Sequence, residues 1–144
     1  IGYVIEGPLG MTYITRGMLE VWGLTDGALH ELAVENLRVR TAHLLHEIGG
    51  PRRAYVALDG YDAARLLVGD LLAPGGIADP VFAIPHEHAC LIEPAVHARE
   101  LRDRSAALRL TTALYRWTEA GPQRIGRDEH HTALPGEAGS NHHG

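Results

Sequence analysis

The stretch TDGALHELAVENLRVRTAHLLHEIGGP, residues 25–51, carries the strongest periodic pattern in the chain. Thr25 is a typical helix N-cap, and Gly49, Gly50 and Pro51 form a typical helix end. Between these two signals, apolar residues recur at the spacing of one helix face. They are Leu29, Leu32, Ala33, Leu37, Leu44, Leu45 and Ile48. The pattern predicts one long helix against which the rest of the chain packs.

A β-hairpin and a short helix are predicted before the long helix. Residues 2–7 and 11–14 have strand patterns, and the Pro8-Leu9-Gly10 sequence between them is a turn signal. Thr15 is a second N-cap, and Gly23 is the expected end of the short helix that Thr15 begins.

After the long helix, strands and helices alternate irregularly. Residues 54–58 have no charged interior residue, which predicts a central strand buried on both faces. The remaining segments are a helix at 61–72, strands at 81–84 and 89–92 with a hairpin tip between them, a long helix at 95–119 that Pro94 opens, and an edge strand at 123–126.

These elements predict an α+β fold. We expect a small mixed or largely antiparallel sheet with hairpins, packed against two long helices and two shorter ones. The chain has 144 residues, which suits one domain, and we assign that domain to residues 1–126. Residues 127–144 are polar and rich in histidine, so this C-terminal tail is expected to be disordered.

Composition excludes several classes of function. All 13 basic residues are arginine, which excludes a P-loop and lysine Schiff-base chemistry. The net charge of −5 argues against nucleic acid as a partner. The one cysteine, Cys90, cannot form an internal disulfide, which favours the cytoplasm, and no apolar stretch approaches the ~20 residues of a membrane span. Ser105 and Ser140 are the only serines, and neither lies in a nucleophile motif.

Several short segments, in matching order, resemble the uncharacterised bacterial YtpQ-like family. They are Tyr13–Thr15, Leu19–Thr25, Leu29–Ala33, Asn36–Leu37, Asp59–Leu67, Val81–Pro85 and Ala89–Ile92, so the resemblance covers roughly residues 3–118. It implies a soluble bacterial protein of the cytoplasm and implies no reaction. The sequence departs from the family at the hairpin tip, where His86-Glu87-His88 replaces a charged or amide turn.

His86, His88 and Cys90 are the candidate metal ligands. Alternate residues of an extended strand point to the same side, so these three side chains can converge, with His97 as a fourth ligand. Imidazole and thiolate are ligands that zinc prefers. The alternative reading makes Cys90 a small core residue and the two histidines part of an exposed turn.

A second candidate is a polar cluster of His30, Asn36, Asp59 and Asp62. Asp59 and Asp62 flank a strand-to-helix turn, where a carboxylate can act as a general base or cation ligand. The alternative is that they stabilise the start of the next helix. His30 and Asn36, which also fit the resembled family, are expected in a hydrogen-bond network.

Arg102, Arg109 and Arg116 recur every seven residues, which places them in one stripe of the predicted helix at 95–119. Such a stripe binds an acidic partner or an RNA backbone, or is simply a solvated face.

The leading hypothesis is a small cytoplasmic domain that binds another protein or itself, in a regulatory or interaction role, with no catalytic centre and no cofactor. The alternative is a zinc-binding domain or zinc-dependent enzyme that uses His86, His88 and Cys90.

Overall fold

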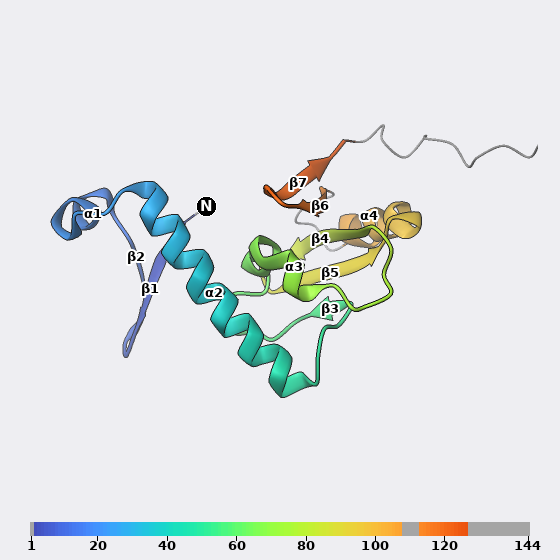
Figure 1. Cartoon of the computed structure of the whole chain (residues 1–144), viewed down its shortest axis with the longest axis horizontal. Helices are drawn as coiled ribbons and strands as arrows, with labels where there is room; N and C mark the ends of the chain where they lie inside the picture. The colour runs from blue at the N-terminus through green and yellow to red at the C-terminus, as the bar shows by residue number, and fades with distance from the viewer. Residues whose placement is uncertain (1, 108–112, 127–144) are drawn as a thin grey trace, which may run out of the picture.

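The structure is a computed structural model that describes residues 2–107 and 113–126. Its helices are α1 (Arg16–Trp22), α2 (Asp26–Ile48), α3 (Gly69–Leu72) and α4 (Ala98–Ala107), with 3-10 turns η1 (Ala64–Val68) and η2 (Ala95–His97) (Figure 1). Its strands are β1 (Val4–Gly7), β2 (Gly10–Tyr13), β3 (Ala54–Tyr55), β4 (Pro80–His86), β5 (Ala89–Pro94), β6 (Leu114–Thr118) and β7 (Gly121–Ile125).

A five-stranded antiparallel sheet in the order β3-β5-β4-β6-β7 forms the centre of the fold. Successive residues of β4 are buried on opposite faces, so the sheet is covered on both sides. Phe82 packs on one face among residues of α2, η1 and α3, and Val81 and Ala83 pack on the other face against α4. The α+β class is therefore confirmed.

The N-terminal hairpin of β1 and β2 forms a separate two-stranded sheet. It lies beside the N-terminal part of α2, away from the five-stranded sheet (Figure 1). The predicted caps are confirmed: the Thr15 and Thr25 side chains accept from backbone N–H groups in the first turns of α1 and α2. Gly23 and Gly49 end these helices in the left-handed conformation, as predicted. Among the described residues, no helix is long and apolar enough to cross a bilayer.

The predicted central strand at 54–58 is wrong in length and position. Only Ala54 and Tyr55 are paired, and β3 lies at one edge of the sheet. The strand ends because the N–H groups of Ala57 and Leu58 donate to the carboxylate of Asp62, at 2.9 and 2.8 Å, instead of continuing the ladder. The uncharged apolar run at residues 54–58 thus lies at an exposed edge of the sheet and not at its buried centre.

The predicted helix at 61–72 is also corrected. The segment consists of the 3-10 turn η1 followed by the single α-helical turn of α3. Val68, the last residue of η1, has φ −124° and ψ 37°, which interrupts the helical backbone before α3. The distortion brings the Gly69 backbone against the ring of Trp117.

The predicted long helix at 95–119 does not extend over its last third. The segment begins with η2 and α4, but Leu114–Thr118 is the strand β6, which pairs with both β4 and β7. The residues of β6 include Tyr115, Trp117 and Thr118, types that favour strands, and pairing on both sides decides the outcome. Arg102 on α4 and Arg116 on β6 therefore do not share one helix face, which corrects the predicted arginine stripe.

The β4–β5 hairpin and the last edge strand are confirmed in position. Arg109, the middle residue of the predicted stripe, lies outside the described residues. The predicted tail at 127–144 also lies outside them.

Gly69 provides a test of the core packing. A Cβ atom built on Gly69 would lie 2.2 Å from Cδ1 of Trp117, which is closer than real contacts allow. We expect Gly69→Ala to lower the free energy of unfolding by about 1–3 kcal/mol, because the ring must move within a packed core. Urea unfolding followed by circular dichroism measures this change. Gly75→Ala, with open space at its Cβ, is the control and should be nearly neutral. An equal effect of both substitutions would contradict the packing.

Candidate functional site

The side chain of Arg65 is fully buried and lies between two aspartates. Its Nη1 donates to Oδ1 of Asp62 at 2.8 Å and to Oδ1 of Asp59 at 3.0 Å, and its Nη2 donates to Oδ2 of Asp59 at 2.5 Å. Asp62 is also fully buried, whereas the Asp59 side chain is 29% exposed. The structure thus brings together two residues of the predicted polar cluster, through an arginine that the sequence analysis did not select.

The buried carboxylate of Asp62 holds the backbone of the preceding loop, residues 56–60, which we call the Leu58 loop. Its two oxygens accept the N–H groups of Ala57 and Leu58. Leu58 has φ +58°, in the left-handed region that a bulky side chain adopts at a cost of about 1–2 kcal/mol. Its side chain nevertheless points outward, and Leu58 is 70% exposed. A buried ion cluster therefore holds a strained loop that presents an apolar side chain to solvent.

Asp59 remains ionised within this cluster. Partial burial opposes its charged form, but the hydrogen bonds from Arg65 and the Tyr61 N–H, together with the positive charges of Arg65 and Arg40, outweigh that effect. The pKa of Asp59 therefore lies below its ordinary value. The 3.0 Å bond from Tyr61 N–H to Asp59 Oδ1 also fixes the turn at Gly60.

The N-terminal hairpin and α2 contact the end of the Leu58 loop and the residue that follows it, Tyr61. The Arg40 guanidinium lies 4.5 Å from the centre of the Tyr61 ring and donates to Glu6 of β1 at 2.6 Å. The Tyr61 hydroxyl donates to the same Glu6 carboxylate at 3.4 Å. Cε of Met11 reaches Gly60 so closely that an added Cβ would lie 3.0 Å from it. Residues far apart in sequence therefore fix the loop from a second side.

The other two members of the predicted polar cluster are placed elsewhere. Nδ1 of His30 lies 2.8 Å from the hydroxyl of Tyr3, so His30 ties the N-terminal hairpin to α2. Asn36 is exposed on α2. The structure therefore joins Asp59 and Asp62 through Arg65 and puts His30 in a different contact.

The three predicted metal ligands are also separated, with the two histidines at a hairpin tip and the cysteine in the core. The rings of His86 and His88 lie 5.2 Å apart at the tip of the β4–β5 hairpin, and the His88 N–H donates to Nδ1 of His86 at 3.2 Å. Cys90 is fully buried among Tyr55, Leu66 and other core residues. Among residues 2–107 and 113–126, no three His, Cys, Asp or Glu side chains are grouped to hold a metal ion.

The two described arginines of the predicted stripe also separate. Arg116 forms a two-pronged ion pair with Asp79, from its Nε at 2.8 Å and its Nη2 at 2.9 Å. Arg102 is half-buried on α4. The charge of Arg116 is therefore matched by Asp79, and this ion pair joins β6 to the residue just before β4.

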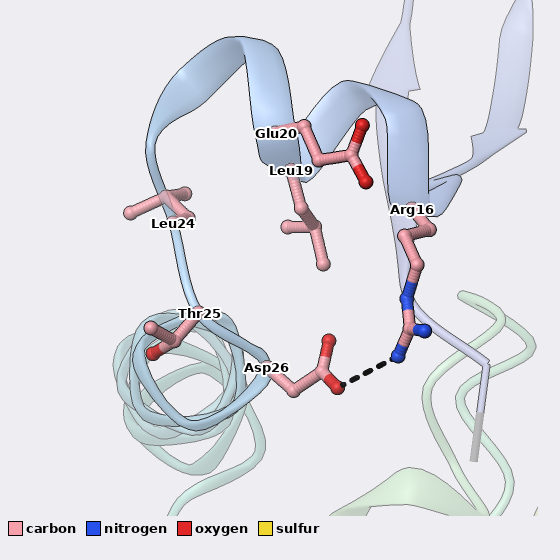
Figure 2. A pocket seen from close by; sticks show the side chains of 6 residues that line it. All are labelled: Arg16, Leu19, Glu20, Leu24, Thr25 and Asp26. Carbon is pink, nitrogen blue, oxygen red and sulfur yellow. Dashed lines mark ion pairs between the residues drawn. The ribbon is translucent and has the colours of Figure 1, made fainter.

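An open pocket of about 310 Å³ lies between α1 and the start of α2 (Figure 2). An ion pair of 3.6 Å joins Arg16 to Asp26 across it, and these side chains are 82% and 75% exposed. Leu19 points toward the space between the two helices (Figure 2). Because its charged groups already face water and each other, this pocket has little to offer a ligand.

Sequence reasoning missed the most unusual feature of the surface, which is its exposed apolar residues. Leu58 and Val56 are 70% and 60% exposed, and Met11 on the adjoining hairpin is 49% exposed. Single exposed apolar residues are ordinary, whereas these three lie on or beside one loop, because Met11 reaches Gly60. The sequence signal was available as the run Ala54–Leu58, but it was interpreted as a buried strand.

The cluster predicts a large effect of removing its cation. We expect Arg65→Met to lower the free energy of unfolding by about 3–5 kcal/mol, because Asp62 would remain buried without a counter-charge. Urea unfolding measures the change. Arg16→Met breaks only the exposed pair with Asp26 and should have little effect. Equal stabilities of the two variants would show that the buried cluster does not hold the fold.

Burial also predicts the chemistry of the single thiol. Desolvation raises the pKa of Cys90 to about 12, so almost no thiolate is present at pH 8. We expect Cys90 to resist iodoacetamide in the folded protein. It should react at once in about 6 M guanidinium chloride, which unfolds most domains. Mass spectrometry of the labelled protein measures the extent of reaction. Fast labelling of the folded protein would contradict the burial.

No family model matches the chain, and no curated protein or solved structure is significantly similar to it.

Proposed function

We propose that this chain is a protein-binding domain and that its docking surface is centred on the Leu58 loop. The observation that carries the proposal is Leu58 itself, which is 70% exposed at φ +58° while its N–H is bonded to a fully buried carboxylate. Asparagine or glycine would relieve the strain at this position, and a polar residue would suit the exposure better. A strained, exposed leucine that the core holds in place is best explained by a partner that covers it.

Rigidity adds to the argument. A partner that docks on a mobile loop loses affinity because the loop must be ordered on binding. The carboxylate of Asp62 holds the N–H groups of Ala57 and Leu58, and the Asp59 side chain holds the N–H of Tyr61. Met11 lies against Gly60, so the Leu58 loop is ordered before a partner arrives. An apolar anchor in a fixed position is the typical centre of an interface.

We further propose that the domain acts in the bacterial cytoplasm. The resemblance to the YtpQ-like family supports a bacterial source, and a single thiol that forms no internal disulfide is suited to a reducing compartment.

Leu58→Asn separates folding from binding. We expect Leu58→Asn to leave the free energy of unfolding unchanged or raise it by up to about 1 kcal/mol, because asparagine tolerates the left-handed conformation. The same substitution should weaken partner binding at least about tenfold, because the apolar anchor is lost. Urea unfolding and calorimetric titration with the purified partner measure the two effects.

The partner is first identified by placing a photo-crosslinking amino acid at position 58 of the full chain, in cells of the organism that encodes it. The same probe at position 96 is the control, since Val96 is 83% exposed on η2, outside the Leu58 loop. We expect a discrete crosslinked protein with the probe at 58 only. Identical patterns at both positions, or binding of the purified partner that Leu58→Asn does not weaken, would refute the proposal.

A further inference from the structure

The edge of the five-stranded sheet at β3 leaves backbone groups without a neighbouring strand. In the described part of the chain β3 is the last strand on this side, next to β5. The N–H of Ile92 donates to the C=O of Arg53 at 2.8 Å, so Ala54, opposite Leu91, falls between the bonded positions. In an antiparallel ladder the N–H and C=O of such a residue point away from the partner strand. Those of Ala54 therefore face outward.

The residues on either side of this position are anchored inward in alternation. Arg53 bonds to β5, Tyr55 is buried and donates its hydroxyl to the C=O of Leu72 at 3.0 Å, and Ala57 donates to Asp62. Val56 lies between two anchored residues, as Ala54 does, and is 60% exposed. Residues 53–57 thus form a fixed edge on which Ala54 and Val56 are exposed, and this edge ends at Leu58, whose φ of +58° is not extended.

The opposite edge of the sheet is protected. Its strand β7 contains Pro122, which has no N–H to offer another strand. Gln123 and Arg124, in the middle of β7, are exposed polar residues. Prolines and charges of this kind are how proteins prevent unwanted strand pairing. The β3 edge carries apolar residues instead, so the two edges differ in the feature that decides whether a strand can be added.

Charge at one end of the β3 edge indicates the chemistry of the added strand. Arg53 and Arg104 donate to the carboxylate of Glu93, at 3.3 and 2.9 Å, and the adjacent Arg52 donates to the C=O of Ile48. Arg53 and Arg104 therefore share one carboxylate, and Arg52 adds a third guanidinium that bonds to a backbone carbonyl. The excess positive charge favours a partner segment with an acidic residue at this end.

We propose that residues 53–57 receive an extended, apolar segment of the partner protein as an additional strand, with a carboxylate of that segment facing Arg52 and Arg53. The added strand bonds to the outward N–H and C=O groups of Ala54 and Val56, and its apolar side chains pack against Val56 and Leu58. The inference rests on the proposed function, because it specifies how the partner engages the Leu58 loop.

The test uses a displayed library of random peptides of about twelve residues, which is longer than the edge and so covers it in any register, selected on the immobilised full chain. We expect enriched peptides to alternate apolar residues and to carry Asp or Glu at one end. A synthetic copy of such a peptide should slow amide hydrogen exchange at Ala54 and Val56 at least about tenfold. Methylation of alternate peptide nitrogens should abolish binding in one register and spare it in the other.

Ala54→Pro removes the outward N–H without removing a bond to β5, since Ala54 is not a bonded position of the ladder. It should reduce peptide affinity at least about tenfold, whereas Ala54→Val should preserve it. Where Ala54→Pro does not fold, the methylated peptides carry the test alone.

Failure to enrich any peptide, or binding without protection at Ala54 and Val56, overturns strand addition. The proposed function survives that result if the probe at position 58 still captures a partner that Leu58→Asn releases. Absence of both results refutes the docking surface as well.

Discussion

The pairing of Arg65 with Asp59 and Asp62 is the constraint on which the surface of this protein depends. A guanidinium buried without partners would be prohibitively unfavourable, so η1 can pack into the core only if both carboxylates turn toward it. The Asp62 carboxylate can accept further hydrogen bonds, and the N–H groups of Ala57 and Leu58 supply two of them. One buried charge thereby determines the path of the backbone from the edge of the sheet into the Leu58 loop.

The same chain of contacts joins the two parts of the fold. Arg40 on α2 lies over Tyr61 and binds Glu6, so the N-terminal hairpin is held near the loop by polar contacts at the surface. The five-stranded sheet, by contrast, is closed by apolar packing on both faces. The polar contacts of the hairpin and the apolar packing of the sheet meet at the loop that contains Gly60. The candidate docking surface therefore lies at this loop and not at the open pocket beside α1.

Local signals predicted the parts of this fold that local interactions determine. Thr15 and Gly23 act within a few residues of their own positions, so the bounds of α1 followed from the sequence. Leu114–Thr118 did not follow, because its strand conformation depends on β4, about thirty residues earlier, and on β7. Only part of the site was predicted. Asp59 and Asp62 were selected for their charge, but nothing in the sequence marks Arg65 as buried or Leu58 as left-handed. Both features arise only when distant segments come together.

Trp22 and Trp117 give the folded chain two very different chromophores. The indole of Trp22, on α1, is 43% exposed to water. The indole nitrogen of Trp117 is shielded from solvent, and its ring lies against Gly69. We therefore expect the intrinsic fluorescence to be the sum of a red-shifted emission from the N-terminal helix and a blue-shifted emission from the sheet. Light emitted at the two ends of that spectrum reports separately on the two halves of the molecule.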